Sequence, residues 1–421
     1  MLDRVPGWLQ DYYAGTFRAA DKAFRHGRVV STAKARAAHW IRWEAFVTPL
    51  GVDPYLQNTI FVHKVRAFTG FAEAIRVRDF NTGGSKVRAP TVSSALTAVG
   101  KKIAMAGGTD PTKDPATGRF LPRIQEQLDG YRKEDPPTQK ELPVEADVPE
   151  FLVGLAMRKG ATEKDKAVGD LVMIAFYYLL RVGEYTKKGK GAQDWDEIET
   201  QTQPFRLKDI AFFSRHSETD RLTRLPTNAS DEVIMSATNA TIKLANQKNG
   251  HKEVCINHEH NLDEINCGVR AIERRYCHIR KHTNNANTTL FTYFEDGKPS
   301  YITDQDIRDA VKMAARALDY EGTRGTPYNL INTHSLRIGG ACALALAGYD
   351  DTQICKMGRW RSQAFREYIR ENLSNYAEGM SKAMKKCHYF VNIDSGTYTD
   401  VSTICELDDN GNILLQSAAA A

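Results

Sequence analysis

The segment from Arg132 to Asp147, RKEDPPTQKELPVEAD, most constrains how this chain of 421 residues can fold. It contains prolines and many charges but few apolar residues, which is typical of a linker rather than of a packed element. A chain of this length is also too long for one compact core. The sequence therefore predicts separate domains on the two sides of residues 132–147.

Apolar residues recur at spacings of three and four along three stretches before this linker. Each stretch starts near Ser, Thr or Asn, which are good helix caps, and ends near a glycine. The stretches are residues 31–51, 58–80 and 89–107. We predict an all-helical domain over residues 31–131, preceded by an N-terminal extension over residues 1–30.

The part after the linker mixes helical and strand patterns. Its expected helices are residues 147–160, 164–186, 267–282 and 304–320, the second apolar enough to be buried. Short stretches rich in β-branched and aromatic residues, typical of strands, are residues 205–213, 232–237, 241–247 and 252–258. An Asn-Gly turn at residues 248–251 predicts a hairpin. We therefore expect a mainly α fold with a small antiparallel β-sheet, over residues 148–390, followed by a polar tail over residues 391–421.

Charge is unevenly distributed along the chain. Residues 1–140 hold 22 Lys and Arg against 13 Asp and Glu, whereas the whole chain has a net charge of only +5. A basic module is the electrostatic footprint expected of binding to a phosphate backbone, although basic helix faces are often simply solvated. The candidate DNA-facing residues are Lys34, Arg36, Arg42, Lys64, Arg66, Arg76, Arg78, Lys86, Arg88, Lys101 and Lys102.

Other features argue against several classes of protein. The seven cysteines form no C-x-x-C pair, which favours reduced thiols inside a cell over a disulfide framework. No apolar run of eighteen residues and no signal peptide occur, so we expect neither export nor membrane insertion. Cys255, His258, His260 and Cys267 come closest to a metal cluster, but their spacing fits no common zinc pattern.

Residues 334–368, HSLRIGGACALALAGYDDTQICKMGRWRSQAFREY, combine a phosphate clamp with a nucleophile. In a helix, His334 and Arg337 lie on one face and can reach one small anion. Trp360 can donate its indole N–H to an oxygen, and Tyr368 can attack a phosphorus atom if cations and a base activate its phenol. Taken singly, the histidine could be a structural helix cap and the tryptophan a core residue.

Arg181 lies at the end of an apolar stretch, in YYLLRVGEY, where a buried charge needs a partner. Glu184, three residues on, can orient its guanidinium, although the two could also form a purely structural ion pair. Arg181 and Arg337 together would match the nonbridging oxygens of a phosphodiester. A lysine can protonate the leaving 5′ oxygen, and Lys248 at the hairpin turn is the first candidate, Lys252 the second; the alternative for Lys248 is a solvated turn residue.

These motifs together resemble those of the tyrosine recombinase superfamily, which includes phage integrases, the Cre recombinase and the recombinases of DIRS and Crypton elements. LLRVGEY resembles the first-arginine motif, QKNG the lysine-bearing turn, HSLR the histidine-x-x-arginine motif, and GRWRSQAFREYIR the segment with the tryptophan and the nucleophile. The resemblance spans about residues 31–385. Its spacing of eight residues from tryptophan to tyrosine is closer to the eukaryotic-element branch than to Cre-like proteins.

The resemblance implies a helical, SAM-like core-binding domain over residues 31–131 and an α+β catalytic domain over residues 148–390. It implies cleavage through a 3′-phosphotyrosyl intermediate, no cofactor and no metal, and a chain that is monomeric or dimeric when free and tetrameric on double-stranded DNA with paired inverted repeats. A helix near residues 375–387 is expected to pack into a neighbouring protomer. The expected location is the nucleus in a eukaryote, or the cytoplasm and nucleoid in a prokaryote. The implied active set is Arg181, Lys248, His334, Arg337, Trp360 and Tyr368, supported by Glu184.

Two alternatives remain open. A type IB topoisomerase shares the tyrosine nucleophile but acts as a monomer without pairing sites, and GRWRS ahead of the tyrosine disfavours it. A domesticated, non-catalytic DNA-binding protein derived from a recombinase would have no need for the tyrosine.

Overall fold

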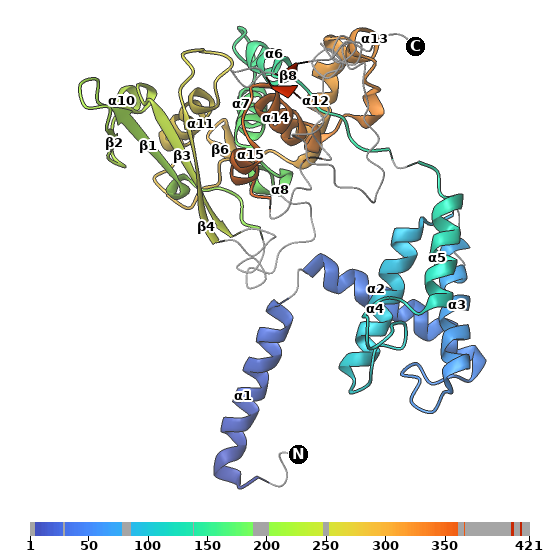
Figure 1. Ribbon diagram of the computed structural model, residues 1–421. Helices are drawn as coiled ribbons and strands as arrows, with labels where there is room; N and C mark the ends of the chain where they lie inside the picture. Colours follow the sequence, from blue (N-terminus) through green and yellow to red (C-terminus); the bar gives the residue numbers. More distant parts are fainter. Residues whose placement is uncertain are drawn as a thin grey trace, which may run out of the picture. The chain divides into compact units, whose positions relative to one another are not determined.

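The computed structural model describes residues 5–27, 30–77, 86–137, 139–187, 202–246, 252–360, 366, 406–407 and 413–414 (Figure 1). The chain divides into one unit of residues 1–369 and a second of residues 370–421. In the second unit, the described residues are the antiparallel strands β7 (Glu406–Leu407) and β8 (Ile413–Leu414). The predicted helix near residues 375–387 lies outside the described residues, as does most of the predicted tail.

The region before residue 135 is helical, as predicted for residues 31–131, whereas the helix in the predicted N-terminal extension was not expected. It contains α1 (Gly7–His26), α2 (Val30–Val47), the 3-10 turn η2 (Thr48–Leu50), α3 (Phe61–Val77), α4 (Ala89–Met105) and α5 (Pro122–Glu134). Fully buried Trp43 stacks on Phe68 with ring centroids 4.6 Å apart and meets the edge of Phe71 at 5.2 Å. These aromatic contacts join α2 to α3, and α5 extends to Glu134, three residues into the predicted linker.

A second buried cluster begins at Val144. It is built first on α6 (Asp147–Ala156) and α7 (Glu163–Tyr177), the latter opened by a capping box between Thr162 and Asp165. The single helix predicted over residues 164–186 is wrong. Helix α7 ends because Leu179 has a left-handed backbone (φ 47°), and a separate short helix, α8 (Val182–Tyr185), follows.

The predicted small antiparallel sheet is confirmed. Its order is β2 (Leu222–Arg224), β1 (Ile210–Arg215), β3 (Asn239–Asn246) and β4 (Lys252–Glu259), with η3 (Leu207–Asp209) before β1. Strands β3 and β4 pair from Asn239 with Glu259 to Asn246 with Lys252, so they flank the predicted hairpin turn, which lies outside the described residues.

The strand predicted over residues 232–237 is wrong, because these residues fall largely in the helix α10 (Asp231–Met235). The Ser230 hydroxyl caps this helix by accepting a hydrogen bond from the Val233 amide. A hairpin of β5 (Thr292–Glu295) and β6 (Lys298–Tyr301) was not predicted. It follows α11 (Gly268–His282), which covers much of the expected range 267–282.

The remaining helices are α12 (Asp304–Ala317), α13 (Tyr320–Arg324), η4 (Tyr328–Leu330), α14 (Thr333–Leu346) and α15 (Asp351–Gly358). Two consecutive glycines let α14 approach its neighbours closely. A Cβ atom at Gly339 would overlap the Val144 carbonyl, and one at Gly340 would overlap the Phe176 carbonyl of α7. Helix α14 thus packs closely on α7, and the Arg337 side chain of the HSLR motif reaches the Leu179 carbonyl just after the end of α7.

The predicted fold class, mainly α with a small antiparallel sheet, is therefore confirmed. None of the helices in the described ranges combines the length and the apolar character needed to cross a membrane.

Candidate active site

Four of the six predicted catalytic residues lie in the described part of the chain. Arg181 immediately precedes α8, His334 and Arg337 lie in the first turns of α14, and Trp360 follows α15. Tyr368 and Lys248 lie outside the described residues, and of Lys252 the structure gives only its backbone place at the start of β4.

Arg181 and Glu184 make the contact that their spacing predicts. The Arg181 Nη1 atom lies 3.3 Å from Glu184 Oε1, and the Arg181 backbone amide donates to Glu184 Oε2 at 2.9 Å. Glu184 is fully buried, whereas 24% of the Arg181 side chain is exposed. The Glu184 carboxylate thus fixes one side of the Arg181 guanidinium, and the exposed part of the Arg181 side chain can contact a bound molecule.

Arg337 is buried, with a relative exposure of 1%. Its Nη1 atom donates to the Leu179 carbonyl and its Nη2 atom to the Gly358 carbonyl. Its Cζ atom lies 4.2 Å from the centroid of the Trp360 ring, within the range of a cation–π contact. Trp360 therefore covers the guanidinium that the sequence assigns to phosphate binding.

The left-handed backbone at Leu179 and the glycine at position 358 present the two carbonyls to Arg337. A Cβ atom at Gly358 would overlap the Trp360 ring, so the close approach of the ring requires glycine at this position. This explains the glycine of the GRW sequence in physical terms.

His334 is partly buried beside the two arginines. Burial, followed by the charges of Arg337 and Arg181, lowers the pKa of His334 to about 4. The imidazole is therefore neutral at pH 7, the form that can accept a proton, but in this structure it is a weaker base than an ordinary histidine.

Arg359 is a member of this site that sequence reasoning missed. Its Nη1 atom lies 3.0 Å from Glu184 Oε2, and its Nη2 atom donates to the Leu179 carbonyl at 2.6 Å. It is one of two arginines in GRWRS, and it is 5% exposed. The available signal was its place directly after a glycine, a residue that is common near the ends of helices.

Among the described residues, the guanidinium groups of Arg181, Arg337 and Arg359 lie together with the carboxylate of Glu184. With His334 neutral, these described groups carry a net positive charge. Such a cluster favours an anion that forms several charge-assisted hydrogen bonds.

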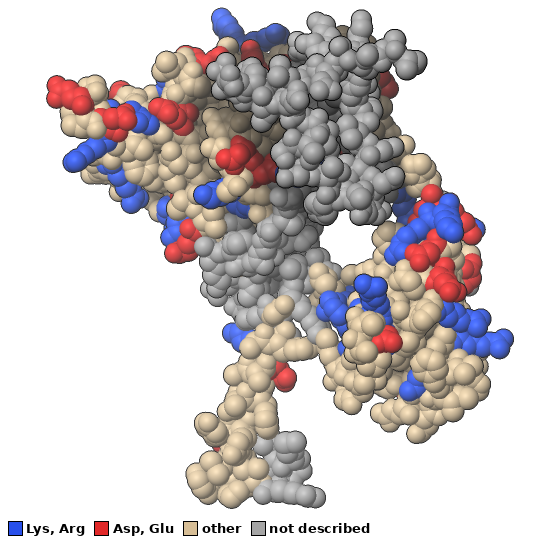
Figure 2. Space-filling model, viewed as in Figure 1, with Lys and Arg blue, Asp and Glu red and all other residues tan. Residues whose placement is uncertain are grey.

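Most of the predicted DNA-facing residues of the helical region reach solvent. Lys34, Arg66, Lys86, Lys101 and Lys102 are exposed, and Arg36, Arg42, Lys64 and Arg88 are intermediate. On the face seen in Figure 2, Lys and Arg of this region are interspersed with Asp and Glu. Their contact with DNA stays a prediction, and Arg78 lies outside the described residues.

Arg76 does not fit that prediction. It is 2% exposed, and its guanidinium pairs with Asp135 and donates to the Val87 carbonyl. The Asp135 carboxylate also accepts from the Ala89 amide at 2.8 Å. In this structure Arg76 joins the end of α3 to the end of α5 and the start of α4, and its charge is neutralised within the protein.

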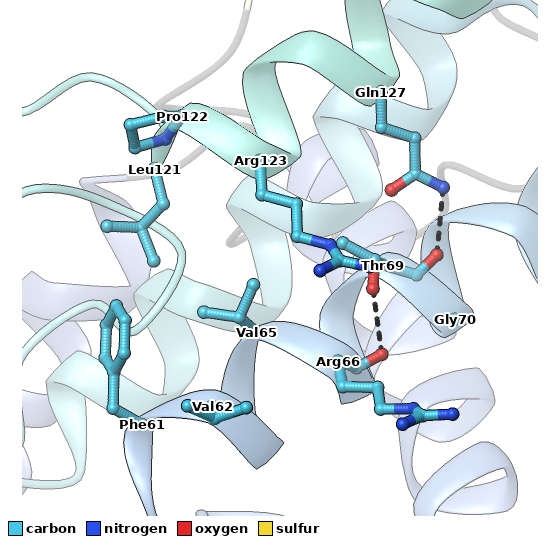
Figure 3. Close-up of a pocket in the computed structure, with 10 residues that line it drawn as sticks. All are labelled: Phe61, Val62, Val65, Arg66, Thr69, Gly70, Leu121, Pro122, Arg123 and Gln127. Atoms are coloured by element: carbon cyan, nitrogen blue, oxygen red, sulfur yellow. Dashed lines mark hydrogen bonds between the residues drawn. The ribbon is translucent and has the colours of Figure 1, made fainter.

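A hollow of about 950 Å³ lies between α3 and the start of α5 (Figure 3). Apolar side chains such as Phe61, Val65 and Leu121 line one end, and Arg66 and Arg123 lie toward the other. The residues that line it include no carboxylate, histidine or cysteine. It therefore lacks the groups for acid–base or nucleophilic chemistry, and the arginine cluster is the better candidate active site.

The possible metal ligands do not converge. In the described ranges, no group of three or more His, Cys, Asp and Glu residues could hold a metal ion. His258 instead bonds through Nε2 to the Tyr177 carbonyl at 2.7 Å, and burial lowers its pKa to about 4.

No protein-family model and no curated protein matches the sequence. Solved structures do resemble the chain. The Tn1549 transposon integrase in complex with transposon right end DNA is 11% identical with a TM-score of 0.38, covering 77% of this chain and 85% of that one. The XerH site-specific recombinase bound to palindromic difH substrate is 13% identical with a TM-score of 0.42, covering 78% and 74%. The XerA recombinase is 14% identical with a TM-score of 0.33, covering 84% and 100%. At these identities and TM-scores the similarity by itself assigns no function to this chain.

Proposed function

We propose that the chain is a tyrosine recombinase, which cleaves and rejoins DNA strands at specific sites with Tyr368 as the nucleophile. One observation carries the proposal: Arg181 and Glu184 gather with His334 and Arg337, about 150 residues further along the chain, in a cluster whose described groups carry a net positive charge. A phosphodiester under attack gains negative charge, and preorganised guanidinium groups stabilise that charge. The order of the LLRVGEY, HSLR and GRW motifs along the chain supports the same function.

The proposed reaction forms one bond and breaks another. The Tyr368 phenol oxygen attacks the scissile phosphorus atom, the bond from phosphorus to the 5′ oxygen breaks, and a 3′-phosphotyrosyl link forms. Neutral His334 accepts the phenol proton, and Lys248 donates a proton to the leaving 5′ oxygen. Attack by a 5′ hydroxyl reverses the steps, so the covalent link conserves the bond energy and no nucleotide cofactor is required.

In this proposal the two arginines differ in how they meet the phosphate. Arg181 is the more exposed of the two and makes the first contact. Arg337, buried under Trp360, contributes its positive charge from the interior of the site. Exposed basic residues of the helical region bind the flanking duplex, and four protomers assemble on two sites, each with paired inverted repeats.

The test uses a nicked suicide duplex built from inverted repeats in the DNA that flanks the coding region. We expect the wild-type chain to form a covalent adduct on it, and Tyr368→Phe to form none while binding the duplex with unchanged affinity. A binding protein without catalysis would leave no adduct with either chain. Relaxation of arbitrary plasmid DNA by a strict monomer would instead indicate a type IB topoisomerase.

A further inference from the structure

Arg359 is the residue of the cluster that no sequence motif assigned to the chemistry. It ends α15 in a left-handed backbone (φ 58°), a conformation that costs energy for a residue other than glycine. The backbone turn directs the side chain inward, where its guanidinium is almost wholly buried. A buried charge in a strained backbone requires an explanation beyond general stability, because a well-packed apolar side chain often stabilises a protein as well as a buried ion pair does.

Each of the two groups that bond Arg359 also bonds one of the two arginines of the proposed site. Glu184 Oε2 accepts from Arg359 Nη1 at 3.0 Å, and the same carboxylate accepts from Arg181. The Leu179 carbonyl accepts from Arg359 Nη2 at 2.6 Å, and the same oxygen accepts from Arg337. Arg359 therefore contacts both groups that orient Arg181 and Arg337, while lying next to Trp360 in sequence.

We propose that Arg359 is a positioning residue that fixes the separation of Arg181 and Arg337 so that both can hold the scissile phosphate. This inference rests on the proposed function. Arg359 acts through Glu184 and the Leu179 carbonyl rather than by touching the DNA. Positioning matters because a displacement of about 1 Å in a catalytic group can slow a reaction about 100-fold.

The planar fork of the guanidinium is what allows one side chain to bond a carboxylate and a carbonyl at once. A lysine ammonium has three donors but a single nitrogen, so it cannot occupy both Nη positions of Arg359. Arg359→Lys keeps the charge that Glu184 needs and removes the fixed geometry. The substitution therefore separates positioning from charge neutralisation.

Arg275 supplies a matched control. It is also a buried arginine, 1% exposed, and it donates from Nε to the Leu290 carbonyl at 3.3 Å and from Nη2 to the Thr292 carbonyl. These partners lie in β5 and just before it, and among the described residues Arg275 hydrogen-bonds to none of the proposed catalytic residues. Arg275→Lys thus reports what the same substitution does to a buried arginine with a structural role.

The experiment measures single-turnover cleavage by the full chain on the suicide duplex, with either a phosphodiester or a methylphosphonate at the scissile position. A methylphosphonate replaces one nonbridging oxygen with a neutral methyl group. Its cleavage rate therefore depends less on correctly placed arginines than the cleavage rate of the phosphodiester does. We expect Arg359→Lys to slow cleavage of the phosphodiester about 10- to 100-fold. On the methylphosphonate the loss should shrink to about 3-fold or less, with the Kd for DNA unchanged within about 2-fold.

The ratio of the two cleavage rates within one variant does not depend on how much of the protein is folded. Arg275→Lys should keep the wild-type ratio even if it lowers the melting temperature. The inference would be overturned if Arg359→Lys slowed cleavage of both substrates equally. It would also be overturned if Arg275→Lys changed the ratio of the two cleavage rates as much as Arg359→Lys does. If Arg359→Lys does not fold, Arg359→Gln, which keeps a donor for the Leu179 carbonyl, is measured in the same way. A wild-type chain that forms no adduct on either substrate contradicts the proposed function itself, whereas a cleaving wild type with an unaffected Arg359→Lys contradicts only the inference.

Discussion

Gly358→Ala is the substitution whose effect on the site follows most directly from the structure. The added Cβ atom would lie 1.6 Å from a Trp360 ring carbon, far inside the ordinary contact distance of about 3.5–4.0 Å between carbon atoms. The ring must therefore move, and it is the ring that lies 4.2 Å from the Arg337 guanidinium. The Gly358 carbonyl, which also holds Arg337, lies on the same residue.

The magnitude follows from three contributions to the free energy of unfolding. Overpacking costs about 1–3 kcal/mol, and loss of a cation–π contact costs about 0.5–2 kcal/mol. Replacing a glycine in a helix by alanine stabilises the helix by about 0.5–1 kcal/mol, which offsets part of these two losses. We therefore expect a net loss of about 0.5–4.5 kcal/mol in urea unfolding, and cleavage at least about 10-fold slower because Arg337 loses its support.

Gly154→Ala is the matched control for this prediction. Gly154 lies in α6, and a Cβ atom there would meet no other atom within 4 Å. We expect Gly154→Ala to be neutral or slightly stabilising and to cleave at the wild-type rate. The reasoning is refuted if Gly358→Ala is as stable and as active as Gly154→Ala.

Three further predictions concern the charges of the chain. Glu184→Gln should lower the free energy of unfolding by about 3 kcal/mol, because it removes the carboxylate that faces two arginines; an unchanged urea midpoint would contradict this. Arg76→Ala should lower the melting temperature yet leave the salt dependence of DNA binding unchanged, whereas Lys101→Ala should reduce the slope of log K against log salt by about 1; equal slopes for both variants would contradict the assignment. The pKa of His334 is depressed to about 4, so the unfolded chain binds more protons than the folded one between about pH 6.5 and pH 4. The stability that neutral His334 contributes is present above pH 6.5 and is lost as the pH falls toward 4. The free energy of unfolding of His334→Gln should therefore fall less than that of the wild type between pH 7 and pH 4.5.

The fold class and most elements could be predicted because their local patterns agree with the tertiary structure. Helices α2, α3 and α4 and the strands β3 and β4 show an apolar periodicity in sequence that agrees with their packing in the structure. The end of α7 and the start of α10 could not be predicted. Leu179 adopts a left-handed backbone that its residue type does not favour, and residues 232–237 look β-branched yet follow a serine cap that starts α10.

The candidate site shows the same division. The contact between Arg181 and Glu184 follows from their spacing, and HSLR does form the start of a helix. The burial of Arg76 and Arg359 does not follow from sequence, because each depends on partners far away along the chain: Asp135 for Arg76, and Glu184 with Leu179 for Arg359. A basic residue next to apolar ones looks the same in a sequence whether it faces solvent or a carboxylate.

The central claim is that Tyr368 becomes joined to DNA, and peptide mapping of the adduct tests it most directly. The wild-type chain is trapped on the suicide duplex, digested with protease and nuclease, and the nucleotide-bearing peptide is sequenced by mass spectrometry. We expect a nucleotide joined through its 3′ phosphate to Tyr368, in a peptide from the GRWRSQAFREYIR segment. A nucleotide on Tyr376 or any other residue, or a cleaved duplex with no covalent peptide, would contradict it.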